Sequence, residues 1–455
     1  MSLTENYDEI ARCNRCGFCQ VACPIFRATG HEAGVARGRV ALLRGLVEER
    51  VAWDNDLQEP LFNCLLCGAC TSNCFPAVGT ADLIQKARGE YLDRVGRSKL
   101  HRFLFQHLLP FPKRLRLAAR AAASAKNRGL TKLARALGLL RIFGRDFSRA
   151  EEIVNRFPDR MFRDQLSAGP IEGTGDLRIG YFVGCGTDIL CPEAAQATLQ
   201  VLRRIGRTVQ VLENCCCGLP AMTYGDRAAA QNLAEKNLRL FQGGPFDVLV
   251  ADCSSCASFL KKYPALFAED DPRRQAAVAQ AARVRDLVQL IGQGATPPRA
   301  GEKEARAPSG GHSPERPEGG LAQVGPVFSP AQTEKIIVTY HDPCHASRGQ
   351  GLVRDPREFL RSLSGVEFRE MAEADWCCGG AGSYALSHYE LAQKVLDRKI
   401  DNLERSGAAV LVTSCPACII HLRYGVRRRG LPVRVCHIAE FLTPRGSCGQ
   451  SAPSH

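Results

Sequence analysis

A cysteine pattern that occurs twice constrains this chain more than any other feature of its sequence. Each copy has a single cysteine, then an adjacent pair followed by glycine, then a Cys-x-x-Cys motif. The first copy comprises Cys185, Cys216, Cys217, Cys253 and Cys256, and the second comprises Cys344, Cys377, Cys378, Cys415 and Cys418. The intervals are 30 and 35 residues in the first copy and 32 and 36 in the second. Such matching intervals indicate that one ligand-bearing unit has been duplicated.

A second duplication, near the N-terminus, has the spacing Cys-x2-Cys-x2-Cys-x3-Cys with a proline close behind. Its cysteines are Cys13, Cys16, Cys19 and Cys23, then Cys64, Cys67, Cys70 and Cys74. In proteins with two 4Fe–4S clusters, this spacing sends three thiolates to one cube and the fourth to the other. We therefore expect one cluster on Cys13, Cys16, Cys19 and Cys74, and a second on Cys64, Cys67, Cys70 and Cys23. The alternative, a pair of zinc sites, usually combines two Cys-x-x-Cys knuckles.

The five thiols of each later copy exceed what a tetrahedral zinc ion or a simple cube requires. Adjacent cysteines cannot easily both bind one small ion, but they can bind different irons of a larger cluster. The count therefore favours polynuclear iron, with zinc on a subset of thiols and buried or redox-active thiols as alternatives. In the triplet before Gly218 we assign Cys216 and Cys217 as ligands, because Gly218 then aligns with Gly379. Cys215 remains an alternative, because pairing it with Cys216 makes the next interval 36.

Two histidines lie close to these arrays. His345 follows Cys344 directly, and His421 lies three residues after Cys418. Either imidazole could supply a ligand or a proton, and the alternative for both is a structural or surface role.

Hydrophobic runs alternate with helical patterns after residue 170, which predicts parallel α/β units. Expected strands cover 177–183, 208–212, 246–251, 335–340, the neighbourhood of Val366, and 408–412; expected helices cover 192–205, 226–241 and 388–403. Ligands of parallel sheets gather beyond the C-terminal strand ends, and all five cysteines of each copy fall at or near such ends. We therefore expect one metal site in each unit.

Composition limits the compartment and the partners. The chain has 22 cysteines in 455 residues, and its first ten residues lack the charged-then-apolar pattern of a secretory signal. We therefore expect a cytoplasmic protein with reduced thiols rather than disulfides. The longest uncharged run, 406–422, contains polar residues and two cysteines, so no membrane-spanning helix is expected.

The net charge of +13 is concentrated in one segment. Residues 98–149 contain 13 Lys or Arg and one acid, Asp146, interleaved with apolar residues at helical spacing. This segment is either a solvated face of connecting helices or a surface for anionic lipid or an acidic partner subunit. Nucleic acid is not an expected partner, because no recognised nucleic-acid-binding module accompanies the charge.

These patterns divide the chain into five segments. Residues 1–95 form a two-cluster ferredoxin-type domain, with a short helix near 38–43, and residues 96–170 form a basic helical connector. Residues 171–292 and 334–445 are the two α/β units. Between them, 293–333 is rich in Gly, Pro, Ser and charge, and we expect a disordered linker there. The expected fold class is α+β and multi-domain.

The motifs carry a family resemblance. The repeated Cys…Cys-Cys-Gly…Cys-x-x-Cys units resemble the CCG domain of heterodisulfide reductase, and the full order resembles the iron–sulfur subunit of glycolate oxidase. Three short motifs fit the glycolate oxidase family: Arg37-Gly-Arg39, the segment from His341 to His345 and the segment from Cys377 to Tyr384. The resemblance implies noncubane 4Fe–4S clusters in complete CCG motifs, in addition to two ordinary 4Fe–4S clusters. Many relatives of the glycolate oxidase type lack some of these cysteines, whereas this chain has all five twice.

The resemblance also implies a function. It predicts an oxidoreductase subunit that passes electrons from an FAD-containing partner, where glycolate, lactate or another 2-hydroxy acid is oxidised, to a quinone or another acceptor. The chain itself has no convincing Gly-x-Gly-x-x-Gly after a strand, which places the flavin on the partner. Peripheral contact with the inner face of the cell membrane is compatible with this expectation. The alternative is a heterodisulfide-reductase-like subunit that reduces a disulfide.

Overall fold

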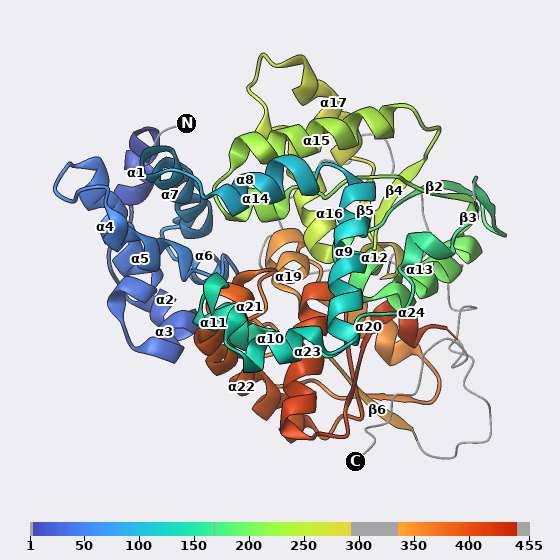
Figure 1. The fold of residues 1–455 in the computed structure, drawn as a ribbon. Helices are drawn as coiled ribbons and strands as arrows, with labels where there is room; N and C mark the ends of the chain where they lie inside the picture. The colour runs from blue at the N-terminus through green and yellow to red at the C-terminus, as the bar shows by residue number, and fades with distance from the viewer. Residues whose placement is uncertain (1–2, 168, 293–334, 444–455) are drawn as a thin grey trace.

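The computed structural model describes residues 3–167, 169–292 and 335–443. Helices build its N-terminal part, which lies at one side of the molecule in blue (Figure 1). They are α1 (Tyr7–Ala11), α2 (Phe18–Ala22), α3 (Pro24–Thr29), α4 (Ala36–Val47), α5 (Gln58–Phe62), α6 (Ala69–Ser72) and α7 (Thr80–Val95). Leu43 of α4, Leu61 of α5 and Leu83 of α7 are fully buried together in a local core. This core holds the helices while the cysteine motifs lie between them, and α4 confirms the helix expected near 38–43.

The basic connector is a series of helices rather than one long helix. It consists of α8 (Lys99–Arg102), a π-helical turn η4 (Phe103–Leu108), α9 (Pro112–Asn127), α10 (Leu130–Ala136), a 3-10 helix η5 (Leu139–Phe143) and α11 (Arg145–Ala150). Gly129, Gly138 and Gly144 separate the later helices and have positive φ angles, a conformation that favours glycine. The connector therefore bends around the molecule, and α11 packs against helices α21 (Tyr384–Ser387) and α22 (Tyr389–Ser406) of the C-terminal part.

The first α/β unit contains a five-stranded sheet in the order β1-β3-β2-β4-β5. Its strands are β1 (Ile171–Glu172), β2 (Leu177–Phe182), β3 (Gly206–Val211), β4 (Val248–Ala251) and β5 (Val284–Asp286). All pairs are parallel except β1 with β3. The helices are α12 (Cys185–Leu190), α13 (Pro192–Ile205), α14 (Leu219–Thr223), α15 (Arg227–Gln242), α16 (Ser254–Lys261), α17 (Pro272–Ala281) and α18 (Leu287–Gly292).

The second α/β unit has a four-stranded parallel sheet in the order β7-β6-β8-β9. Its strands are β6 (Ile336–Tyr340), β7 (Val366–Phe368), β8 (Val410–Thr413) and β9 (Arg434–His437). Besides α21 and α22, its helices are α19 (Cys344–Gln350), α20 (Arg354–Ser362), α23 (Pro416–Arg429) and α24 (Ile438–Phe441). This order repeats β3-β2-β4-β5 of the first sheet, so the duplicated cysteine pattern corresponds to a duplicated topology.

The two units pack against each other through equivalent helices. Helix α16 contacts α19, and its counterpart α23 contacts α12, the counterpart of α19. The pairs α13 with α24 and α18 with α20 are related in the same way. Two buried clusters combine apolar residues of both units, so the interface is continuous with the cores. This reciprocal packing brings the C-terminal strand ends of both sheets together.

The predicted α/β elements are confirmed with shifts of a few residues at their ends. Helix α13 has the expected bounds, and α15 begins after Asp226, whose side chain accepts a hydrogen bond from the Ala229 backbone N–H at 3.1 Å. Strands β1, β5 and β9 were not predicted, because each is short and lies at a sheet edge. The linker expected at 293–333 lies outside the described residues, and the segment boundaries stay predictions. None of the helices in the described ranges combines the length and hydrophobicity needed to cross a bilayer.

Candidate metal centres

The two N-terminal motifs have the same backbone conformation. In the first, Arg15 and Gly17 have φ angles of 55° and 90°; in the second, Leu66 and Gly68 have φ angles of 52° and 73°. The left-handed residues flank the second cysteine of each motif and turn the chain, so that successive thiols can face a common point. Helices α2 and α6, which follow these glycines, contact each other. The two motifs are therefore adjacent as well as alike.

The thiols expected at the second 4Fe–4S cluster lie together. Cys23 from the first motif lines one pocket with Cys64, Cys67 and Cys70 from the second. Burial raises the pKa of Cys70, and the neighbouring Cys64, Cys67 and Cys23 raise it further. Cys23 is buried and the other three cysteines are partly buried. Four sulfurs around one pocket form a donor set suited to an iron–sulfur cluster, which stabilises them as thiolates.

The thiols expected at the first cluster lie nearer the surface. Cys16 is exposed, whereas Cys13, Cys19 and Cys74 are partly buried. Burial raises the pKa of Cys19, and Cys13 and Cys16 lie close enough to contribute. Cys74 packs with Cys13 against the N-terminal core, and its sulfur accepts a hydrogen bond from the Val78 backbone N–H at 3.4 Å. The membership of Cys74 in this site stays a prediction.

Two buried arginines lie beside the pocket of the second cluster. Arg39 donates hydrogen bonds to the Pro60 carbonyl and to Asn63. Burial raises the pKa values of Cys23 and Cys70, and the positive charge of Arg39 opposes part of that rise. Arg88 donates to the carbonyl oxygens of Leu61 and Cys64, and burial lowers its own pKa to about 10. These cations offset part of the negative charge that several thiolates would bring into the protein interior.

In the first α/β unit, the five predicted thiols follow the ends of three adjacent parallel strands. Cys185 begins α12 after β2, Cys216 and Cys217 follow β3, and Cys253 precedes α16 after β4. The thiols of Cys216 and Cys256 interact with that of Cys217 and lower its pKa to about 5. Interaction with Cys216 and burial together raise the pKa of Cys185. The structure therefore brings the whole first array to one sheet edge, as the strand-end pattern predicted.

Cys215 differs from its two neighbours in the triplet. Its thiol donates a hydrogen bond to the side-chain oxygen of Asn237 at 3.3 Å and also lies near the Leu233 carbonyl. Cys216 and Cys217 instead interact with Cys185 and Cys256. This geometry favours Cys216 and Cys217 over Cys215 as the ligand pair.

The second array repeats this arrangement. Cys377 interacts with Cys344 and Cys378, and Cys378 interacts in turn with Cys418. The interactions with Cys377 and Cys418 lower the pKa of Cys378, and the nearby imidazole of His341 contributes in the same direction. Donor atoms of His341, Cys378 and Cys418 lie within 4.8 Å of one another, and all three residues are buried.

The candidate sites are not isolated from one another. The thiol of Cys67 interacts with that of Cys377, and this contact and burial raise the pKa of Cys67. Cys253 and Cys418 both interact with Cys415, which lowers the pKa of Cys415. The junction between the halves is fixed by Ser254, whose backbone N–H and hydroxyl group bond to the carbonyl oxygen and hydroxyl group of Ser414 at 3.1 and 2.7 Å.

The two histidines chosen from sequence have protein partners. The Nδ1 atom of His345 is 3.1 Å from the Ser255 hydroxyl, and the Nδ1 atom of His421 is 2.8 Å from the Cys378 carbonyl oxygen. The sequence interpretation gave no role to Arg88 or Arg348, and it treated His341 only as part of a motif. Their positions depend on contacts between distant segments, so local spacing carried no signal for Arg88 or Arg348.

Three family models match the chain in succession. The 4Fe-4S dicluster domain matches residues 9–77, and the linker region of the glycolate oxidase iron-sulfur subunit matches 96–154. The Cysteine-rich domain, CCG, matches twice, at 179–261 and 338–423. These ranges contain the two N-terminal motifs, the basic connector and both later arrays.

Comparisons with individual proteins agree with these family matches. A probable glycolate oxidase iron-sulfur subunit of Bacillus subtilis is 28% identical over 447 residues, covering 95% of this chain and 93% of that protein. A fumarate reductase (CoM/CoB) subunit of Methanothermobacter marburgensis is 30% identical over 284 residues, 61% of this chain and 49% of that protein. Lactate utilization protein A of Exiguobacterium sp. is 28% identical and covers 58% of this chain and 96% of that protein. The chain is therefore a homologue of the glycolate oxidase iron–sulfur subunit, with a 4Fe–4S dicluster domain, that subunit's linker region and two CCG domains.

Proposed function

We propose that this chain is the electron-transfer subunit of a flavin-dependent glycolate or lactate dehydrogenase complex. One observation carries the proposal: candidate ligands of three sites form an unbroken series of interacting thiols. The series runs through Cys67, Cys377, Cys378, Cys418, Cys415, Cys253, Cys256, Cys217, Cys216 and Cys185. Electron transfer requires closely spaced centres, whereas independent structural zinc sites have no need to touch. The arrangement therefore supports a relay.

The proposed ligand sets follow the arrays. Cys13, Cys16, Cys19 and Cys74 hold one 4Fe–4S cluster, and Cys64, Cys67, Cys70 and Cys23 hold the other. Each CCG domain holds a further iron–sulfur centre, of the noncubane type where all five of its cysteines take part. Thiolate ligation of this kind supplies one-electron carriers, and buried cations such as Arg39 and Arg88 adjust their potentials.

The donor in this proposal is an FAD-containing partner chain that oxidises the 2-hydroxy acid, and the acceptor is a quinone or another carrier. The names of the Bacillus and Exiguobacterium relatives refer to glycolate oxidase and lactate utilization, which supports these two substrates. The purified chain alone should not oxidise glycolate or lactate with an artificial acceptor, whereas the complex with the flavoprotein should. Oxidation by the chain alone, without flavin, would overturn the proposal.

Metal analysis tests the cofactor assignment directly. Iron, sulfide and zinc should be measured on anaerobically purified protein, together with EPR of the reduced form. About eight irons per chain would fill only the two ordinary clusters, and about sixteen would fill all four sites. Zinc in stoichiometric amounts without iron–sulfur absorption would instead indicate a structural scaffold.

Disulfide reduction is the second candidate function. The observation that favours it is the direct interaction of Cys253 with Cys415, which joins the arrays of the two CCG domains. The name of the Methanothermobacter relative also refers to CoM/CoB. Reduction of a CoM/CoB-type heterodisulfide with reduced viologen would favour this function, and flavin-dependent turnover of a hydroxy acid would favour the first.

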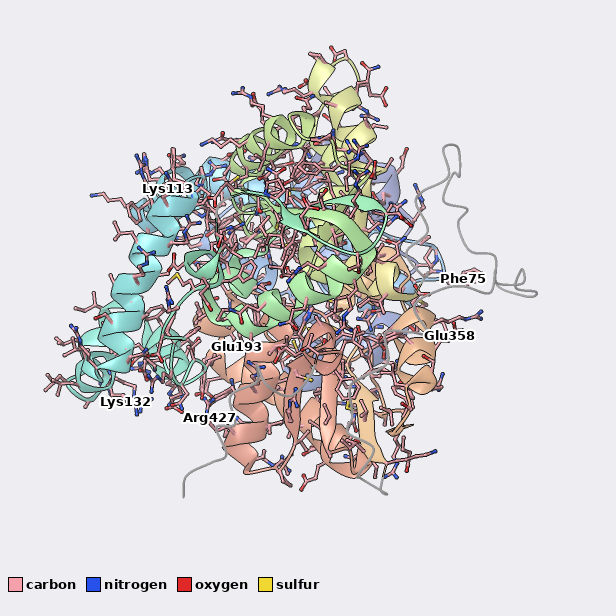
Figure 2. The ribbon with its side chains drawn as sticks, turned by 90° about the vertical axis from the view of Figure 1, so that its right-hand side faces the viewer. Phe75, Lys113, Lys132, Glu193, Glu358 and Arg427 are labelled. Carbon is pink, nitrogen blue, oxygen red and sulfur yellow. The ribbon has the colours of Figure 1, made fainter. Side chains whose placement is uncertain are left out.

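We further propose that the connector gives the complex a peripheral membrane contact. Leu130, Leu133 and Leu137 share one face of α10 and its C-terminal end, and 53%, 57% and 65% of their surfaces are exposed. Exposed Lys132 and Arg128 lie beside them. Figure 2 shows Lys113 and Lys132 toward opposite ends of α9 and α10, along the outer border of the molecule. Exposed leucines among exposed cations are typical of helices that bind anionic bilayers.

Vesicle flotation tests this contact. The chain should bind vesicles containing phosphatidylglycerol but not pure phosphatidylcholine, and salt should weaken binding. Leu133→Ser with Leu137→Ser should reduce binding several-fold. The control is Val278→Ser, because Val278 on α17 is 52% exposed but lies outside the connector. Salt-independent binding to neutral vesicles, or an equal loss in the control, would contradict the contact.

A further inference from the structure

His341 is a buried imidazole without an oxygen or nitrogen partner. Its exposed fraction is 1%, and neither Nδ1 nor Nε2 makes a hydrogen bond with an oxygen or nitrogen atom of the described residues. The polar group beside the ring is the thiol of Cys378, whose pKa the imidazole helps to lower. Burying an imidazole in this way removes both nitrogens from water without replacing the lost hydrogen bonds, which is unfavourable. A native protein retains such a group where something else satisfies it.

The backbone holds His341 firmly in place. It directly follows β6, and its N–H donates a hydrogen bond to the Val412 carbonyl of β8 at 2.9 Å. The next residue, Asp342, accepts hydrogen bonds from both terminal nitrogens of Arg357, at 2.9 and 2.6 Å. The imidazole therefore stands at a rigid strand end rather than on an adaptable loop.

The neighbours of this imidazole are two candidate ligands. A ring nitrogen of His341 and the sulfurs of Cys378 and Cys418 lie within 4.8 Å of one another. One nitrogen and two sulfur donors at this separation can bind a common zinc or iron centre after small adjustments, because metal–ligand distances in such sites are about 2.0–2.3 Å. The donors come from three separate parts of the second CCG domain: the end of β6, the loop before α21, and helix α23.

The nearby histidines are less available as metal ligands, because their ring nitrogens already have hydrogen-bond partners. The nitrogens of His421 face the Cys378 carbonyl oxygen and Gln393, at 2.8 and 3.4 Å. Nδ1 of His345 faces the Ser255 hydroxyl, and Nε2 of His437 faces the Asp252 carbonyl oxygen at 2.8 Å. Within the described ranges, His341 is the buried histidine whose two nitrogens both lack such a partner.

The first CCG domain has no equivalent of this donor. His341 lies three residues before Cys344, and the residue three before Cys185 is Phe182. Phe182 is 1% exposed and packs against Phe241, with ring centroids 6.1 Å apart. An apolar ring fills the position in one domain, and a nitrogen donor occupies it in the other.

We infer that His341 is a nitrogen ligand of the metal centre in the second CCG domain, together with Cys378 and Cys418. The inference rests on the proposed function only in expecting a metal at this site. An imidazole is a neutral ligand, and where it binds in place of one of the five thiolates it raises the reduction potential of an iron–sulfur centre. The two CCG domains therefore differ in potential although their cysteines match, and the second is the better electron acceptor.

The test is pulsed EPR on the full chain, purified anaerobically with nitrogen-15-labelled histidine and reduced in steps. The wild-type protein should show a strongly coupled histidine nitrogen on one cluster signal. In His341→Phe, which copies the first domain, that coupling should be lost, and in His341→Cys the potential of the same signal should fall. His421→Gln, in the same region, should keep the coupling.

The labelled wild-type measurement decides the matter even where a variant fails to fold. Absence of a directly bound histidine nitrogen in a wild-type protein whose second CCG domain holds metal overturns the inference, as does its persistence in His341→Phe. If the site holds zinc, zinc-edge X-ray absorption takes the place of EPR. A nitrogen ligand that is present in the wild type and lost in His341→Phe then supports His341 as a metal ligand. The presence of zinc itself would refute the proposed electron relay through this site. All-sulfur zinc coordination overturns both.

Discussion

Arg348 donates a hydrogen bond from its guanidinium group to the backbone carbonyl oxygen of Cys67, at 3.5 Å. Arg348 lies on α19 of the second CCG domain, whereas Cys67 belongs to the dicluster motif. The same guanidinium group donates to the backbone and side-chain oxygens of Asp375 at 2.9 and 2.7 Å. It also lies near the thiols of Cys344 and Cys377. One cation thus connects the ligand loops of two proposed centres.

Replacing this cation should change the potentials of those centres. In Arg348→Gln we expect the midpoint potentials of the two adjacent clusters to fall, because a nearby positive charge stabilises the more negative, reduced form. The expected shift is on the order of 60 mV, which corresponds to a tenfold change in a one-electron equilibrium. EPR-monitored redox titration of the full chain measures it.

Two controls accompany this measurement. Arg348→Lys keeps the charge but not the forked hydrogen bonds, so its shift should be smaller. Arg361→Gln removes an arginine that stacks on Phe368, outside the arrays, and should leave the potentials unchanged. Unaltered potentials in Arg348→Gln would show that the guanidinium group acts only as a structural link.

The cysteine triplet gives a prediction about metal content. Cys217→Ser should lower the iron bound by the first CCG domain, because the Cys217 thiol interacts with Cys216 and Cys256. Cys215→Ser should keep that iron, because a serine hydroxyl can still donate to Asn237. Iron and sulfide analysis of both variants distinguishes them. The reverse result would assign the ligand role to Cys215.

The N-cap of α15 should be a sensitive point for stability. Asp226 caps the Ala229 N–H and also contacts His101 and Arg97, at 2.9 and 3.4 Å, across the contact with the connector. Asp226→Ala should lower the free energy of unfolding by about 2 kcal/mol, at the upper end of measured cap losses. The shift of the urea midpoint, followed by circular dichroism, measures this loss.

Asp271 provides the matched control. It caps α17 through the Arg273 N–H, but among the described residues its only charged partner is Arg273 on its own helix. Asp271→Ala should therefore shift the urea midpoint less than Asp226→Ala. Equal shifts would mean that the contacts of Asp226 with the connector add nothing to its role as a cap.

His388 should make stability depend on pH. Burial and the nearby charge of Arg88 lower the pKa of this imidazole from about 6.5 to about 4, and its ring stacks on Tyr384 at 4.6 Å. Between these values the unfolded chain binds a proton that the folded chain excludes, so stability falls as the pH decreases through this window. His388→Gln should reduce the loss of stability between pH 7.5 and 5.5, measured from urea midpoints. The exposed His31→Gln should not, and an unchanged slope in His388→Gln would contradict the assignment.

Much of the fold followed from local patterns. The buried runs before Cys185 and Cys344 predicted strands, and the Asp226 cap and the apolar spacing after it predicted α15, because these features involve residues close in sequence. The edge strands β5 and β9 escaped prediction, since three or four residues carry too little periodicity. The linker at 293–333 and the membership of Cys74 in the first cluster stay predictions.

The sequence by itself determined which thiols are available and that each array collects at one sheet edge, because spacing and strand order are local properties. Only the tertiary structure decided how the arrays meet. Reciprocal packing of α16 on α19 and of α23 on α12 places Cys253 beside Cys415, and docking of the N-terminal domain places Cys67 beside Cys377. These neighbours lie far apart in the chain, so the burial of shared apolar surface brings them together, with hydrogen bonds such as those of Ser254 with Ser414 and of Arg348 with Cys67.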